Sequence, residues 1–189
     1  MAVFRLFERL HDMFFALLQH LAGSWFLGLA SRLIFSSVLL MYFVNSVRTK
    51  VGSGFPDFLI PGSGAYLQIL PAITEAADYD TDAIAMIPYG LIVYMGTYAE
   101  IILPVLILLG LFTRAASLAM LGFIAVMTYV DITFHGVGAE TVGALFDRVQ
   151  DSAISDQRLL WALPLIYLML QGPGTISLDH LFGRTKKLV

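Results

Sequence analysis

Four long apolar runs constrain the fold of this chain more than any other feature. A helix needs about 20 consecutive, mostly apolar residues to cross the hydrocarbon core of a bilayer. Within that core, only helices and closed barrels satisfy every backbone hydrogen bond. The last run is the shortest in unbroken form, because Gly-Pro-Gly follows it closely. We predict an all-α, membrane-embedded four-helix bundle with spans near residues 25–44, 87–109, 115–130 and 159–176.

The composition agrees with a lipid environment. Apolar residues make up 58% of the chain and charged residues only 13%, too few to cover a water-soluble globule of 189 residues. There is no cysteine, which excludes disulfides, a thiol redox relay and a thiolate metal site. The net charge of -3 provides no basic surface for nucleic acid. We expect a single membrane domain over residues 1–189 that contacts lipid and no nucleic acid.

Residues 1–23 precede the first run and are predicted to form an amphipathic interfacial helix. Apolar residues recur there at helical spacing, with Arg5, Glu8, Arg9 and Asp12 between them. The two acids, and the lack of a small-residue cleavage site, argue against a cleaved signal peptide. We expect the helix to be retained and to lie in the lipid interface. Packing against a soluble partner is the alternative.

The polar connections set the expected topology. Two are long and acidic, at residues 45–86 and 131–158, whereas a tight turn at 110–114 joins the second and third spans. Four spans place both termini and this turn on one side of the membrane. Basic residues are in slight excess on that side: Arg5, Arg9, Arg114, Arg184, Lys186 and Lys187, against Arg48, Lys50, Arg148 and Arg158. Since basic residues favour the cytoplasmic side, we expect both termini in the cytoplasm and the long loops outside.

Two charged residues lie inside the predicted spans, Arg32 in the first and Glu100 in the second. Ionisable groups are expensive within a bilayer and are, by default, candidates for a functional site. Counted from the cytoplasmic ends of their spans, both residues lie roughly 12 to 14 Å deep, at about 1.5 Å per residue. We therefore predict that the two side chains meet.

Several neighbours of Glu100 could belong to the same site. Gly96 and Pro104 share its helical stripe, and Thr97 lies beside it. Tyr167 of the fourth span could reach the same depth. Pro104 cannot donate an N–H to the carbonyl of Glu100, which leaves a backbone acceptor unpaired. Two interpretations of the charged pair stay open: a buried ion pair that fixes helix register, or the polar end of a cavity that binds the head of a lipid-soluble ligand such as a quinone.

Asp131 and His135 have the helical i, i+4 spacing that could give a metal two ligands, and Glu140 follows them. No second histidine lies nearby in the sequence. A hydrogen-bonded pair at the end of the third span is therefore the favoured interpretation. These two residues are weak metal candidates, and no metal site is assigned.

Three further features stand out: Arg32 followed by an apolar stretch and Lys50, YAE at residues 98–100 leading to LLGLFTRAA at 108–116, and GPGTISLD at 172–179. Together they resemble the DoxX family of small bacterial integral membrane proteins. The resemblance implies a four-helix fold in the bacterial inner membrane and places the family's intramembrane arginine and glutamate at Arg32 and Glu100. It also implies a link to quinone-coupled and sulfur-related redox systems. The chain departs from the family in its long acidic first loop and its N-terminal segment.

The leading hypothesis is a membrane subunit of a redox system that binds quinone, or a related lipid-soluble ligand, near Arg32 and Glu100. No intrinsic cofactor is evident, because the sequence lacks cysteine, a haem-ligand pair and a dinucleotide fingerprint. A protein partner would then supply the redox centre. The alternative is a non-catalytic anchor or scaffold that recruits partner proteins, and a third interpretation is a small transporter or metal-stress protein. Enzymatic activity and oligomeric state stay open.

Overall fold

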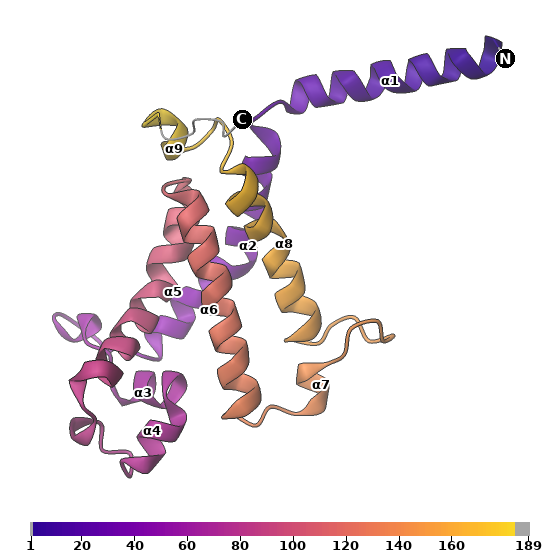
Figure 1. Cartoon of the computed structure of the whole chain (residues 1–189). Helices are drawn as coiled ribbons and strands as arrows, with labels where there is room; N and C mark the ends of the chain where they lie inside the picture. The colour runs from indigo at the N-terminus through magenta and orange to yellow at the C-terminus, as the bar shows by residue number, and fades with distance from the viewer. Residues whose placement is uncertain (1, 184–189) are drawn as a thin grey trace.

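The computed structural model of the chain describes residues 2–183. Helices are its regular elements, and no β-strand forms within that range, so the all-α prediction is confirmed. The short helices lie mainly in the two long connections (Figure 1). The long ones are α1 (Ala2–Ala22), α2 (Phe26–Arg48), α5 (Leu91–Leu109), α6 (Thr113–Thr133) and α8 (Ser155–Gln171).

Four of the long helices pack side by side. α2 contacts α5 and α8, and α6 contacts the same two helices, so the four form a closed ring. Three segments are long and apolar enough to cross a membrane: Phe26–Arg48, Met86–Leu109 and Thr113–Thr133. α8 has 17 residues, fewer than the 23 of α2, and it begins earlier and ends earlier than the fourth predicted run. The chain is therefore a membrane protein with at least three spanning helices.

The core of the ring is apolar and lies on one stripe of each helix. Buried residues of α2 recur every three or four positions, as Phe35, Leu39 and Phe43 do, which is the helical period. They pack against buried side chains of the other three helices, Ile107, Met120, Ile124, Leu165 and Leu168. The outward stripes are also apolar, which is the arrangement that a bilayer requires.

The end of the bundle that carries the α5–α6 connection is called the turn end. Gly110 terminates α5 in the left-handed conformation, with φ 68°, which glycine adopts without a steric penalty. The backbone N–H groups of Phe112 and Thr113 donate to the two carboxylate oxygens of Asp179, at 2.8 Å each. The N–H of Asp179 in turn donates to the carbonyl of Gly110, at 2.8 Å. Asp179 therefore caps α6 from a distant part of the chain.

The opposite end, called the loop end, carries the two long connections. The first contains α3 (Ser63–Ile69), α4 (Pro71–Ala76) and short turns of helix, and the second contains α7 (Ala139–Val142). Figure 1 shows α3 and α4 at the loop end of the bundle, beyond α5. Tyr98 of α5 fastens the first connection, because its hydroxyl donates to the carbonyl of Leu59 at 2.7 Å. The connections thus cover this end of the bundle with short helices.

α1 leaves the turn end and projects away from the bundle (Figure 1). All residues from 4 to 21 are exposed, and Figure 1 shows the helix running across the direction of the bundle. Gly23, with φ 48°, makes the bend into α2, and the indole N–H of Trp25 donates to the carbonyl of Leu21 at 3.1 Å. The structure thus has a helix where the sequence predicts one, attached by a short bend to the first span.

Candidate ligand-binding site

Glu100 forms a buried ion pair with Lys50. The ammonium nitrogen of Lys50 lies 2.8 Å from Oε1 and 2.9 Å from Oε2 of Glu100, and the two side chains are 4% and 6% exposed. The same nitrogen donates to the hydroxyl of Ser46 at 2.6 Å. An ammonium has three N–H donors, so all three are used. Lys50 therefore has no unused hydrogen-bond donor.

Arg32 does not meet Glu100, so the predicted ion pair is wrong. Bonds from Cα to Cβ tilt toward the N-terminus of a helix, and long side chains follow that direction. α2 begins at the turn end, so Arg32 extends toward that end. α5 begins at the loop end, so Glu100 extends the opposite way. Similar depths of the two Cα atoms therefore do not bring the charged groups together.

Arg32 belongs instead to the turn end. Its Nη1 donates to the carbonyl of Ile176 at 2.9 Å, and its side chain lies against Gly110. Arg32 is 4% exposed, close enough to Asp179 for their charges to attract. The arginine thus holds the C-terminal segment onto α2 and does not take part in the Glu100 site.

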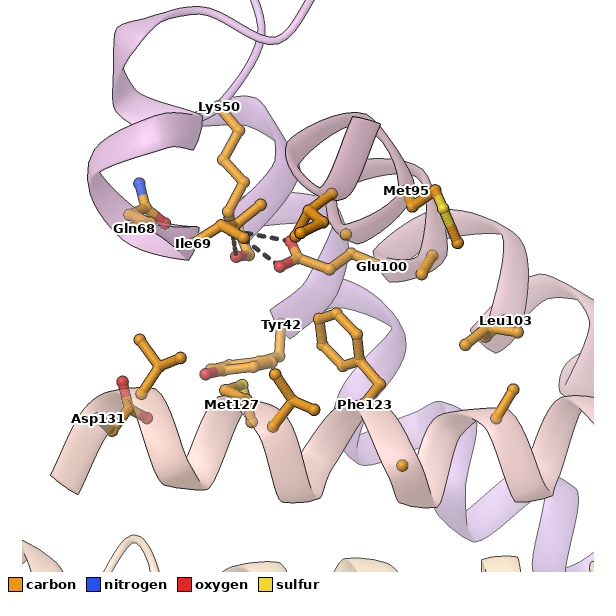
Figure 2. A pocket seen from close by; sticks show the side chains of 18 of the residues that line it. Tyr42, Lys50, Gln68, Ile69, Met95, Glu100, Leu103, Phe123, Met127 and Asp131 are labelled. Carbon is orange, nitrogen blue, oxygen red and sulfur yellow. Dashed lines mark hydrogen bonds and ion pairs between the residues drawn. The ribbon is translucent and has the colours of Figure 1, made fainter. Parts of the chain in front are cut away.

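A cavity of about 690 Å³ adjoins the Lys50–Glu100 pair. It lies at the loop-end half of the bundle, with walls from α2, α5 and α6 and a cover from α3. Figure 2 shows Tyr42 and Phe123 lying across the cavity from the charged pair, with Met127 further along α6. Most of its other lining side chains are apolar: Ile69, Ile92, Met95, Ala99, Leu103, Ala119, Val126 and Val130.

The polar groups of the cavity gather around the ion pair. Ser46, Gln68 and Tyr42 line it together with Lys50 and Glu100. A carboxylate offers about four lone-pair positions, and Lys50 uses one on each oxygen, so Glu100 retains acceptor capacity. The hydroxyl of Tyr42 has no hydrogen-bond partner among residues 2–183 and is a free donor. One cavity therefore offers both a hydrogen-bond acceptor and a hydrogen-bond donor.

Of the residues predicted to surround Glu100, one lines the cavity and the others are buried or partly buried elsewhere in the bundle. Gly96 lines the cavity. Thr97 and Pro104 are buried on α5 but outside the lining, and the Thr97 hydroxyl has no partner among the described residues. Tyr167 packs, partly buried, against the apolar core and does not line the cavity. The predicted neighbourhood is thus only partly assembled at the site.

Asp131 and His135 do not bond to each other. Asp131 pairs with Nη2 of Arg158 from α8, whose Nη1 donates to the Thr128 hydroxyl at 2.7 Å. His135 lies beyond the end of α6, and its Nε2 is 3.2 Å from the carbonyl of Gln68. No group of three or more metal-binding side chains comes together in the described part of the chain. Both residues line the cavity rim separately, so the helix-end pair was the wrong interpretation.

Lys50, Ser46, Tyr42 and Gln68 are the site residues that sequence reasoning missed. Lys50 is noted above for the family resemblance, but not as the partner of Glu100. The direction of side chains along a helix was a usable signal, because Glu100 points toward the loop end, where Lys50 lies just beyond α2. Gln68 carried no such signal, since only the folding of the first connection brings it to the cavity.

The ring of helices and the charged pair inside it define the chain as an α-helical integral membrane protein with a polar, cavity-lining site. The family model that matches it is DoxX, over residues 27–136. The chain belongs to the DoxX family, as the motifs indicated. The matched range contains both Lys50 and Glu100. Neither a curated protein nor a solved structure gives a significant match.

Proposed function

We propose that this protein binds a quinone, or a related lipid-soluble carrier, in the cavity beside Lys50 and Glu100, as an inner-membrane subunit of a redox system. The observation that carries this proposal is the position of a complete, buried ion pair at the edge of a largely apolar cavity. Ligand sites are typically apolar with a few polar groups that orient the ligand. A quinone has a flat apolar body and polar ring oxygens, which matches these walls.

The unused hydrogen-bond donor and the unused acceptor of the site suit the two redox forms of such a carrier. A quinone presents carbonyl oxygens, which accept hydrogen bonds, and Tyr42 supplies an unused O–H donor. A quinol presents hydroxyl groups, which donate, and the Glu100 carboxylate retains acceptor positions. We propose that Tyr42 orients the oxidised ring and Glu100 the reduced one, with Lys50 holding the carboxylate in place.

We propose that a protein partner delivers or removes the electrons. The sequence contains no cysteine, so the chain cannot hold an iron–sulfur cluster by thiolates or run a thiol relay. The role of this subunit would be to bind and orient the carrier. Glu100 would also hold or release a proton at the ring oxygen.

The two tryptophans of the chain allow a direct binding test. Trp161 of α8 lies near the cavity, with its ring centre 5.7 Å from that of the cavity-lining Tyr42, whereas Trp25 lies at the turn end. Quinones quench tryptophan fluorescence on contact. In a Trp25→Phe background, a decyl-substituted benzoquinone should quench Trp161 saturably. In a Trp161→Phe background, the same titration should give only weak, linear quenching of Trp25.

Variants then assign the binding to the proposed residues. Glu100→Gln should weaken the saturable phase by at least about tenfold, which corresponds to about 1.4 kcal/mol of binding free energy. Arg32→Gln is the control, because Arg32 is buried at the other end of the bundle. Equal affinities in both variants, or no saturable phase in the parent protein, would exclude a quinone site at Glu100.

We propose that α8 is a fourth span, which completes a four-helix membrane bundle. At the loop end its Arg158 contacts Asp131 and Thr128 of α6. At the turn end Arg114 of α6 donates to the carbonyl of Leu170 at 3.0 Å. α8 therefore accompanies α6 from one end to the other, and α6 is long enough to cross. The turn end would face the cytoplasm, as the excess of basic residues there favours.

We propose that α1 lies in the lipid interface on the cytoplasmic side. Its apolar residues share one broad face, and Arg5, Glu8, Arg9 and Asp12 share the other. Since the native chain has no cysteine, single cysteines report its surroundings. In proteoliposomes, Phe7→Cys should resist a water-soluble maleimide while Arg9→Cys reacts. Equal labelling of the two positions would contradict an interfacial position.

One observation favours a second function, a membrane scaffold. α1 makes no extensive contact with another described helix, and its large apolar side chains are widely exposed, with Phe4 at 69% and Phe7 at 68%. Such a helix could recruit a protein partner. Two variants distinguish the two functions. Partner co-purification that survives Glu100→Gln but not Phe7→Glu supports a scaffold, whereas loss of quinone-dependent activity in Glu100→Gln supports the redox subunit.

A further inference from the structure

We infer that the cavity is entered sideways from the bilayer, between α5 and α6, and that its ligand is an amphiphile whose apolar tail stays in the lipid while its head reaches Lys50 and Glu100. This inference rests on the proposed function and narrows the ligand to a class. A water-soluble molecule of the same head group would lack the tail that occupies the opening.

Small residues line the cavity on two facing helices. Gly96 and Ala99 of α5 and Ala119 and Gly122 of α6 all line the cavity. Gly122 and Ala119 are exposed on the outer surface of the bundle as well. A methyl group added at Gly122 would meet no atom within 4 Å. The space beside Gly122 is therefore open, whereas Gly96 is covered by Ile69, whose Cδ1 would lie 3.0 Å from an added methyl group.

The rim of the opening faces lipid and not water. Met95 and Val126 line the cavity and are 64% and 62% exposed. Both lie in segments long and apolar enough to cross the membrane, so their exposed surfaces contact acyl chains. An apolar tail can pass from lipid into this opening without crossing a polar layer.

The arrangement of α5 and α6 explains why the opening lies on this side. A tight turn at Gly110 joins the helices at the turn end, and Figure 1 shows them diverging from it toward the loop end. The other sides of the cavity are occupied, since α2 contributes Tyr42 and Ser46, and α3 contributes Gln68 and Ile69. Most of the polar groups lie on the α2 and α3 sides, and Glu100 of α5 is held toward them by Lys50. This arrangement places the head of the ligand beside the ion pair and its tail toward the gap.

Gly122→Phe tests the opening without touching the charged pair. The first side-chain atom added at Gly122 meets nothing within 4 Å, and the ring beyond it would occupy the gap. Ala125→Phe is the matched control, since Ala125 is an exposed small residue on the same helix that does not line the cavity. Two probes are compared by Trp161 quenching in proteoliposomes: a dimethoxybenzoquinone with a decyl tail, and the same ring without the tail.

Relative to its concentration in the lipid, the tailed probe should bind Gly122→Phe at least about tenfold more weakly than it binds the parent protein, because the added ring occupies the place of the tail in the opening. Ala125→Phe should bind the tailed probe as the parent does, and the tail-less ring should bind all three proteins alike. If Gly122→Phe binds the tailed probe as the parent does, the lateral entry is wrong although the quinone site stands. If neither probe binds the parent saturably, both proposals fail together.

Discussion

The ammonium of Lys50 bridges both carboxylate oxygens of Glu100, joining the residue that follows α2 to the middle of α5. These two helices pack directly against each other. Two opposite charges in a buried place lose much hydration, and their mutual attraction must offset that loss. The pair therefore fixes the register of the helices as well as presenting a carboxylate to the cavity.

Removing one partner should destabilise the protein more than removing both. Lys50→Met leaves the Glu100 carboxylate buried without its cation, and Glu100→Leu leaves the ammonium without its anion. Each single change should lower the free energy of unfolding by about 3–5 kcal/mol. The double variant should recover part of this loss, because neither charge is then uncompensated. Unfolding by denaturing detergent, followed by circular dichroism, measures all four proteins.

The same double variant separates stability from function. It should refold to a stable bundle and still fail to bind the benzoquinone, because the acceptor at Glu100 is gone. A double variant less stable than either single one would show that the pair contributes favourable energy beyond mutual compensation, contrary to this prediction.

Arg32 should matter for stability and not for binding. Arg32→Met removes the hydrogen bond to the carbonyl of Ile176 and leaves Asp179 without its nearby cation. A hydrogen bond from a charged donor contributes about 1.5–3 kcal/mol, and a loss of that order in the free energy of unfolding is expected. Quinone affinity should stay within about twofold of the parent value, a difference of less than 1 kcal/mol. A tenfold loss of quinone affinity in a folded Arg32→Met protein would contradict this prediction and show that Arg32 contributes to the binding site.

The helical fold could be predicted because the physics of a bilayer is simple. Apolar runs of sufficient length become spanning helices, and the first three runs correspond to Phe26–Arg48, Met86–Leu109 and Thr113–Thr133. The fourth span was predicted to begin later than α8 does, because the first turn of α8, with Asp156 and Arg158, is polar and resembles a loop in the sequence. Those polar groups are satisfied by α6 and by Ser152, which only the folded chain reveals.

The site could be predicted only in part. The cost of a buried charge pointed correctly to Glu100 as a residue with a special environment. Depth along a helix did not identify its partner, because it locates Cα atoms and ignores the direction in which side chains extend. Lys50 lies just beyond the first span, where a lysine is ordinarily a solvated end residue. The first connection, with Gln68 on α3, covers the site through contacts that no local pattern encodes.

Asp179 should be a stabilising cap for α6. Asp179→Ala removes the acceptor for the N–H groups of Phe112 and Thr113, and losing a helix cap costs about 0.5–2 kcal/mol. Asp179→Asn keeps one acceptor oxygen and should lose about half as much. Ser177→Ala is the neighbouring control, because it removes the bond from the N–H of His180 in the short α9 and the bond to the carbonyl of Gly174 but leaves α6 capped. It should change stability less than Asp179→Ala does. Thermal unfolding in detergent ranks the three variants, and an Asp179→Ala protein as stable as the parent would rule out this cap.

Two glycines in spanning helices should respond in opposite directions to the same small change. A methyl group at Gly28 would lie 2.4 Å from the backbone carbonyl atoms of Pro173, so Gly28→Ala must push the C-terminal segment away from α2. Overpacking of this kind costs about 1–3 kcal/mol. At Gly122 the methyl group meets nothing, and replacing a helical glycine by alanine gains about 0.5–1 kcal/mol. Unfolding in denaturing detergent compares the Gly28→Ala and Gly122→Ala variants. Equal stabilities would mean that Pro173 does not pack on α2. The hydrogen bond from Arg32 to the nearby carbonyl of Ile176 would then be in question as well.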